Sequence, residues 1–266
     1  MAGDGVPGYL DGPAQKARFN KPYGVAIDST GNIFISEYEF HRIRKINKFN
    51  EVSTFSGTGK PGYSDGQPGS FNSPRGIAVD SQGNLIVADA MNNVIRRISK
   101  TGTVSTIAGD GTAGYTNGRA LTSSFNAPRA VAVDSKDNII VADTRNHAIR
   151  YINMGEGSVS TIGGDGSAGY KDGHSSTSKL NWPVGVVVDV QDNVIVTDAC
   201  NHAIRKINLA RSFITTVSGG GTHGYVDAST SKAKFYRPAG ITIDLEGNYI
   251  ITEDYNHRIR KITNQE

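Results

Sequence analysis

The sequence predicts an all-β protein built from five copies of one four-stranded unit. The copies begin at Pro22, Pro74, Pro128, Pro183 and Pro238, so successive steps are 52, 54, 55 and 55 residues. A period that drifts in this way is typical of stacked units whose loops vary in length while their strands do not. Short apolar runs rich in β-branched residues alternate with turn signals, and no helical period interrupts them.

The second copy shows the predicted strands most clearly. A Pro-Arg-Gly turn at residues 74–76 leads into the first apolar run, and a Ser-Gln-Gly-Asn turn separates that run from the second. The second run is apolar without alternation, which indicates a strand buried on both faces. The third and fourth runs are increasingly polar. The four predicted strands are residues 77–80, 85–88, 94–98 and 104–107.

Four strands repeated at this period are typical of a β-propeller blade, because a sandwich has no reason to repeat its sequence. The unit Pro-x-Gly, apolar strand, Asp-x-x-Gly-Asn, apolar strand, Asp-x-x-Asn-His-x-Ile-Arg resembles the NHL repeat over essentially the whole chain. The first copy departs from it with Glu37 and Phe40, and the second has Asn93 in place of histidine. The matching positions are Asp143, Asn146, His147, Ile149 and Arg150; Asp198, Asn201, His202, Ile204 and Arg205; and Asp254, Asn256, His257, Ile259 and Arg260.

This resemblance implies a single NHL-type β-propeller over residues 1–266. The repeats are expected at about 2–56, 57–108, 109–163, 164–218 and 219–266. The last blade is expected to lack its outer strand, so the chain is either a five-bladed ring or an incomplete array of the six-bladed type. An unpaired strand edge exposes backbone donors and acceptors, which suggests self-association as a hypothesis.

Composition excludes several classes of protein. The formal net charge is +3, with acidic and basic residues interspersed, so no strong field favours nucleic acid or an anionic membrane. The one cysteine, Cys200, excludes an internal disulfide. The sequence shows no secretion signal and no run of about 20 apolar residues. We therefore expect a soluble chain, and the compartment stays unknown.

Strand direction places the longer loops at one end of each blade. The glycine-rich connector between blades and the turn from the second to the third strand emerge together, and we call this end the long-loop face. The turns at the opposite end are short. Varied loops on a rigid scaffold are the usual place for recognition, so a site is expected on the long-loop face.

The repeated polar residues are interpreted as structural. Histidines at the start of the third strand in different blades lie too far apart to share one ion, so neither a metal nor a cofactor is expected. The same structural interpretation covers the acids, taken as turn acceptors, and the arginines, taken as ties between blades. The histidines are His41, His147, His202 and His257; the acids are Asp89, Asp143, Asp198 and Asp254; the arginines are Arg96, Arg150, Arg205 and Arg260.

Residues that break the repeat are better candidates for binding. Arginine, aromatic and methionine side chains at positions specific to one copy are typical of recognition surfaces. Drift in solvent-exposed loops is the alternative for each of them. The predicted binding residues are Tyr23, Tyr38, Arg75, Met91, Arg129, Arg145, Trp182, Arg237 and Tyr255.

The leading functional hypothesis is a non-enzymatic binding or scaffold propeller that presents its long-loop face to a macromolecule, with a protein as the expected partner. RNA is a weaker possibility, based on arginines beside aromatic residues. A second hypothesis is a structural array that assembles through an open blade edge. A third is a lyase or hydrolase with a metal on the axis; the innermost strands offer small or apolar groups there, which disfavours it.

Overall fold

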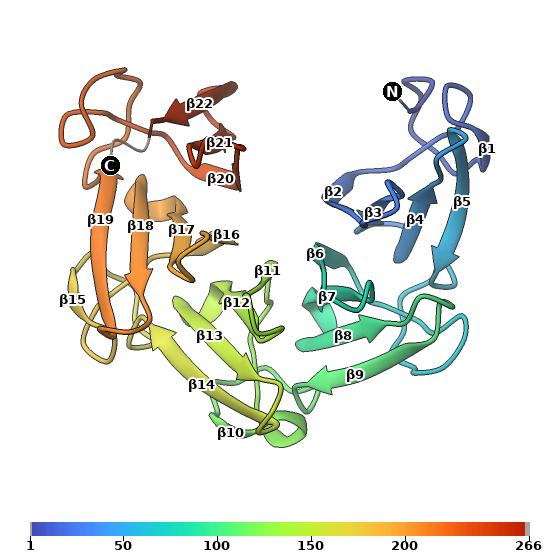
Figure 1. Cartoon of the computed structure of the whole chain (residues 1–266), viewed down its shortest axis with the longest axis horizontal. Helices are drawn as coiled ribbons and strands as arrows, with labels where there is room; N and C mark the ends of the chain where they lie inside the picture. Colours follow the sequence, from blue (N-terminus) through green and yellow to red (C-terminus); the bar gives the residue numbers. More distant parts are fainter. Residues whose placement is uncertain (1, 264–266) are drawn as a thin grey trace. The chain divides into compact units, whose positions relative to one another are not determined.

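The computed structural model describes residues 2–263, and the chain divides into two compact units. Unit 1 is Met1–Thr116 with Ala120–Ala130, and unit 2 is Asn117–Arg119 with Val131–Glu266. Figure 1 shows the strands of each unit in sequence colours. Each unit is described by itself below.

Unit 1 contains two antiparallel sheets. The first has the order β1-β5-β4-β3-β2 and the second has the order β6-β7-β8-β9. A single turn of 3-10 helix, η1 (Ala90–Asn92), follows β7, and η2 (Ala120–Thr122) packs near β9. The strands are β1 (Gly12–Pro13), β2 (Pro22–Ile27), β3 (Ile33–Glu37), β4 (Arg42–Ile46), β5 (Glu51–Ser56), β6 (Pro74–Val79), β7 (Leu85–Asp89), β8 (Val94–Ile98) and β9 (Val104–Ala108).

Unit 2 contains three antiparallel sheets, with the orders β10-β14-β13-β12-β11, β15-β19-β18-β17-β16 and β20-β21-β22. The 3-10 turns η3 (Thr144–Asn146) and η4 (Ala199–Asn201) follow β12 and β17. The strands are β10 (Gly118–Arg119), β11 (Ala130–Val133), β12 (Ile139–Asp143), β13 (Ala148–Asn153), β14 (Ser158–Gly163), β15 (Gly173–His174), β16 (Pro183–Val188), β17 (Val194–Asp198), β18 (Ala203–Asn208), β19 (Phe213–Gly219), β20 (Pro238–Ile243), β21 (Tyr249–Glu253) and β22 (Arg258–Ile262).

The all-β prediction and the four antiparallel strands of each copy are confirmed for four copies. Three sheets carry an extra two-residue strand (β1, β10 or β15) that comes from the connector before the blade and pairs with its outer strand. The sequence analysis missed these strands because two residues carry no periodicity. The fifth copy has three strands among residues 2–263, as predicted.

The second strand of the second, third and fourth copies lies in the middle of the core. All five residues of β7 are buried, and so are those of β12 and β17, which confirms the interpretation of the apolar run. Within unit 1, Phe34 and Phe71 pack with Ile77, Leu85 and Val87 in one cluster. Because side chains from two consecutive sheets share this cluster, its burial holds the sheets together.

Glycine allows consecutive sheets to approach closely at their first strands. The Gly185 amide donates to Thr197 Oγ1 at 2.7 Å, and that hydroxyl donates to the Ala239 carbonyl of the next sheet at 2.7 Å. A Cβ at Gly185 would lie 2.3 Å from the same carbonyl. Glycine at position 185 is therefore required by packing between these two sheets.

Across residues 2–263, the structure contains no helix of the length and apolar character needed to cross a membrane. Cys200 is a free cysteine.

Candidate functional site

The turn after the second strand links each blade to the next. His147 ends η3 in the left-handed conformation, with φ at 50°, and its Nδ1 accepts the Trp182 amide of the next copy at 3.1 Å. Trp182, the donor, stands just before the proline of the next blade and also has the left-handed conformation, with φ at 60°. The same bond joins His41 to Ser73 and His202 to Arg237, and Asn93 Oδ1 replaces imidazole in the bond to Ala127.

The structural interpretation of His41, His147 and His202 therefore has a specific basis. A backbone amide can only donate, so the Nδ1 atom that faces it must be unprotonated. Burial lowers the pKa of all three imidazoles, and for His202 the nearby His223 and Arg237 lower it further. These three side chains are committed to holding blades together.

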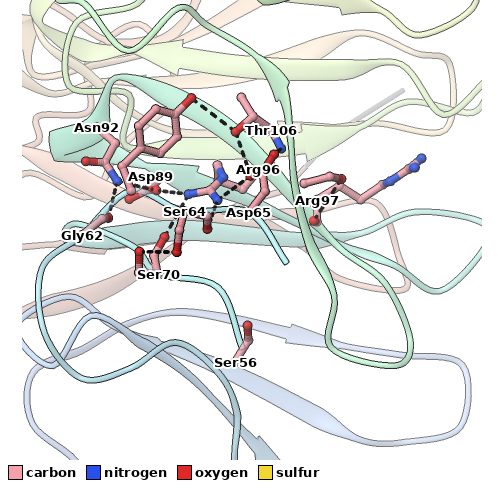
Figure 2. A network of polar contacts seen from close by, with 12 residues as sticks. Ser56, Gly62, Ser64, Asp65, Ser70, Asp89, Asn92, Arg96, Arg97 and Thr106 are labelled. Carbon is pink, nitrogen blue, oxygen red and sulfur yellow. Dashed lines mark hydrogen bonds and ion pairs between the residues drawn. The ribbon is translucent and has the colours of Figure 1, made fainter. Parts of the chain in front are cut away.

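A buried arginine in the third strand organises each connector, as Figure 2 shows for Arg96. Its guanidinium pairs with Asp89 at 2.8 Å and Asp65 at 2.7 Å, and donates to the carbonyls of Ser70 and Ser64 at 3.0 and 2.7 Å. Asp89 also accepts the Asn72 amide at 2.7 Å. The charge of the Arg96 guanidinium and most of its hydrogen-bond donors are therefore satisfied, as a buried ion pair requires.

Two predictions about these residues were wrong. The arginines, expected as ties between blades, bind their own sheet and the connector that precedes it, because their guanidinium lies under the connector. The acid of the fifth copy is Glu253 instead of Asp254: Arg260 pairs with Glu253 at 2.7 Å, seven residues before it. Asp89 and Asp198 stand seven residues before Arg96 and Arg205 in the same way.

In unit 1, three predicted residues form a tyrosine and arginine cluster on the long-loop face. Tyr23 and Tyr38 meet edge to face with ring centroids 6.2 Å apart. The Arg75 guanidinium of the next sheet lies 5.0 Å from the Tyr23 ring and 5.1 Å from the Tyr38 ring. Lys21 pairs with Glu39 at 2.5 Å beside them. Tyr23 is 39% exposed, so an aromatic face and a cation are both accessible there.

In unit 2, two predicted residues belong to a larger aromatic stack. Arg237 lies 5.1 Å from the Tyr255 ring, and Tyr255 packs against Tyr236 with centroids 4.9 Å apart. Tyr236 stacks on His223 at 4.5 Å and 19° between planes. Tyr236 and His223 each also meet His202 edge to face at 5.5 Å. We call His202, His223, Tyr236, Arg237 and Tyr255 the aromatic stack.

The remaining predicted residues have other surroundings. Met91 lies in η1 and is half exposed, and Arg145 lies exposed in η3. The Arg129 carbonyl accepts the Gly76 amide at 2.9 Å, so its backbone has a structural role. Trp182 is partly buried and lies 6.3 Å from the His147 ring. These four positions do not add to either cluster.

Sequence reasoning missed Tyr236 and His223, although both carry a signal. Tyr236 stands where Asn20, Asn72, Asn126 and Asn181 stand in the other copies, and His223 replaces a small residue or proline before the Gly-Tyr pair of the connector. A comparison of the copies position by position would have marked both residues as departures.

Each cluster by itself offers aromatic faces and a guanidinium group, which suit the binding of a carboxylate or of an aromatic or apolar side chain. Among residues 2–263, no three His, Cys, Asp or Glu side chains are grouped as a metal site would need. The predicted residues Arg75 and Arg237 are held by ring contacts, so both cations are pre-positioned.

Sequence comparison agrees with the repeat pattern. The NHL repeat family model matches residues 71–97, 125–150 and 180–207. The chain therefore has NHL repeats at these three segments. The chain is 28% identical, over 98% of its length, to Protein SUPPRESSOR OF QUENCHING 1, chloroplastic, of Arabidopsis thaliana. It is 25% identical, over 97% of its length, to NHL repeat-containing protein 2 of Gallus gallus. The chain spans 27% and 41% of the length of these relatives.

One solved structure similar to this chain is that of an auxiliary nutrient binding protein from Bacteroides ovatus. It is 19% identical, with a TM-score of 0.72, and the match covers 94% of this chain and 61% of that one. At this identity the likeness concerns the fold alone. The prediction that the chain is an all-β protein of the β-propeller class is confirmed.

Proposed function

We propose that this chain is a non-enzymatic binding module that presents its long-loop face to a protein partner. The observation that carries the proposal is that, in each unit, an arginine is held against tyrosines at this face. Arg75 lies against the exposed Tyr23 and the half-buried Tyr38, and Arg237 lies against the exposed Tyr255. Tyrosine and arginine are the side chains that most often dominate protein interfaces.

The physical argument rests on pre-organisation. A free arginine loses rotamer freedom when it binds, whereas a guanidinium already stacked on aromatic rings has lost much of that freedom in advance. Arg237 also donates to the Tyr255 hydroxyl at 3.5 Å, which further restrains it. Tyr255 remains 52% exposed, so it can contribute contact area at low entropic cost. The partner surface that fits best carries a carboxylate flanked by apolar groups.

A capture experiment with matched variants tests this proposal. The immobilised chain, its Arg75→Ala and Arg237→Ala variants, and a Lys136→Ala control are each incubated with a lysate of cells that make the protein, and recovered proteins are quantified by mass spectrometry. Lys136 is an exposed cation in the short turn between β11 and β12, at the opposite end of its blade.

We expect one or more proteins to be recovered by the unchanged chain and the Lys136 variant, and to fall at least tenfold with Arg75→Ala or Arg237→Ala. The strongest of these is then purified and its affinity for the same four chains is measured by calorimetry. The proposal would be contradicted if the recovered proteins bound both arginine variants as well as the unchanged chain and were lost only with Lys136→Ala. Stoichiometric zinc or calcium in the purified chain would contradict its non-enzymatic part.

A further inference from the structure

A pocket of about 360 Å³ lies between the third and fourth copies, at the end of the blades opposite the long-loop face. Asp134, Lys136 and Tyr151 of the third copy line it, together with residues 191–193 and 208–210 of the fourth. Both copies belong to unit 2. The lining combines carboxylates and amides with a phenol ring and two small apolar side chains. A pocket of this volume fits a small ligand or one long side chain.

The fourth and fifth copies show which chemical group occupies the corresponding position there. Lys206 Nζ lies 3.3 Å from Asp189 Oδ2. Lys261 Nζ lies 2.9 Å from Asp244 Oδ2. In both copies the lysine stands in the third strand, and the aspartate opens the turn that follows the first strand. The ammonium group therefore neutralises the carboxylate of the turn.

Tyr151 replaces this lysine in the third copy. It stands opposite Ile140 of β12. Lys206 stands opposite Ile195 of β17 in the same register. The Tyr151 hydroxyl donates to Asp134 Oδ2 at 3.0 Å. Because a phenol is neutral, this hydrogen bond satisfies an acceptor and leaves the negative charge of Asp134 without a counter-charge.

The Asp134 carboxylate is buried, with 8% of the residue exposed. Within residues 2–263 its hydrogen bonds come from neutral groups alone. They are the backbone amides of Lys136 and Asn138, the Asn138 side-chain amide and the Tyr151 hydroxyl. A buried charge is costly unless an opposite charge is paired with it. The pocket beside Asp134 therefore favours a cation that comes from outside the sheet.

A second carboxylate makes the pocket more negative. Asp192 lines it and accepts the amide and the hydroxyl of the serine after Asp134, at 3.1 and 2.6 Å. The Tyr151 phenol responds to this charge: burial raises its pKa, and the carboxylates of Asp134, Asp192 and Glu156 raise it further. Lys136 is the cation of the lining, and it is exposed, so water screens its opposing charge. The balance of charge in the pocket is negative.

We propose that this pocket binds a primary alkylammonium group, whose charge is held by Asp134 and Asp192. The alkyl chain packs against the Tyr151 ring and the apolar side chains of residues 209–210. The ligand ammonium thus takes the place that a lysine of the third strand has in the fourth and fifth copies. A lysine side chain of a peptide and a free small amine both supply this group. The site is independent of the proposed function of the long-loop face.

Calorimetric titration with small ligands tests the proposal. The probes are Nα-acetyl-lysine methylamide, the same compound acetylated at Nε, and pentylamine. We expect one lysine methylamide to bind per chain, with a dissociation constant of about 0.1–1 mM, as suits a ligand of this size. Nε-acetylation removes the charge and keeps the chain, so it is expected to weaken binding at least about tenfold.

The same titrations distinguish the two sources of the ammonium group. Tighter binding of the lysine methylamide than of pentylamine supports the proposal with a peptide lysine as the ligand. The reverse order supports it with a free amine, because the peptide units then add nothing. Equal binding of the charged and the Nε-acetylated compound would overturn the proposal, and so would the absence of saturable binding of both amines up to about 10 mM.

Protein variants identify the carboxylates. Tyr151→Lys supplies the ammonium from within the chain, as Lys206 does in the fourth copy, so it is expected to abolish ligand binding and to raise resistance to urea. Asp192→Asn removes a charge at a left-handed position that asparagine tolerates, and is expected to weaken binding about fivefold. Glu246→Gln removes an exposed charge from the corresponding turn of the fifth copy and is the control, with unchanged binding expected.

Nuclear magnetic resonance locates the bound ligand. Amide signals of residues 191–193 and 208–210 are expected to shift on addition of the lysine methylamide, in proportion to the calorimetric saturation. Signals of the aromatic stack, at the other end of the blades, are expected to stay in place. Full binding by a folded Tyr151→Lys variant would overturn the proposal, as would signal shifts confined to residues outside the pocket.

Discussion

The residue that ends the turn after the second strand connects consecutive copies through one hydrogen bond in the first four copies. A left-handed histidine or asparagine accepts the amide that precedes the next proline, at distances from 2.9 to 3.2 Å. Asn93 in the second copy demonstrates that an acceptor atom, and not an imidazole as such, is needed. This bond gives His41, His147 and His202 a structural reason to recur.

Protonation of His202 should destabilise unit 2. Burial, with His223 and Arg237 nearby, lowers its pKa in the folded state, so the unfolded chain binds protons more readily near pH 6. The stabilisation is present above the unfolded pKa, roughly 6.5, and is lost as pH falls through the folded pKa. We expect His202→Asn, which keeps an acceptor as Asn93 does, to lose less stability between pH 7.5 and 5.5 than the unchanged chain.

Urea unfolding at the two pH values measures this difference. Burial raises the pKa of Asp89 and Asp198 to about 6, so these carboxyls bind protons more readily in the folded state and act in the opposite direction. They are present in both proteins and cancel in the comparison. The expected change in slope is at most about 1.4 kcal/mol per pH unit for one group. Identical slopes for the two proteins would show that His202 does not titrate in this way.

At the scale of the element, the blade is held by close contact at its first strand and by the connector at its outer strand. The Pro-x-Gly entry brings β16 against β20, and the buried arginines hold the connectors. Neither feature depends on the loops that vary between copies. The variable loops can therefore carry binding residues without loss of the blade.

A methyl group at Gly185 should separate two neighbouring sheets. Gly185→Ala places a Cβ 2.3 Å from the Ala239 carbonyl, and overpacking of this kind costs about 1–3 kcal/mol. Gly240→Ala is the matched control, since the nearest atom to its Cβ is the Thr252 side chain at 2.9 Å and the residue is exposed. Chemical denaturation should show a clear loss for Gly185→Ala and a smaller change for Gly240→Ala, and equal losses would contradict the packing argument.

At the scale of the whole molecule, charge argues against nucleic acid as the main partner. The net charge is +3, and many of the arginines and lysines are already in ion pairs, such as Arg96 with Asp65 and Lys261 with Asp244. Because positive and negative charges nearly balance, the chain offers little net attraction for a phosphate backbone. The near-neutral charge therefore fits the proposed protein partner better than RNA.

Binding to single-stranded RNA is expected to be weak and strongly dependent on salt. A labelled 12-nucleotide RNA titrated at 50 and 200 mM salt should show a dissociation constant above about 10 μM at the higher concentration, in the range of non-specific binding. Arg75→Ala should change it little. A submicromolar dissociation constant at 200 mM salt that is lost in Arg75→Ala would indicate that the partner is RNA and not a protein.

The sequence by itself determined the fold class, the unit and the buried second strand, because these follow from periodicity and turn chemistry within a single copy. It also located Tyr23, Tyr38, Arg75, Arg237 and Tyr255 on the long-loop face, because strand direction sorts loops by end. What only the tertiary structure decided are contacts between residues far apart in the chain. The arginines bind their connectors, Glu253 replaces Asp254 as the acid of the fifth copy, and Tyr236 with His223 completes the aromatic stack. Such pairings depend on how strands are placed in three dimensions, and repeat spacing alone does not encode them.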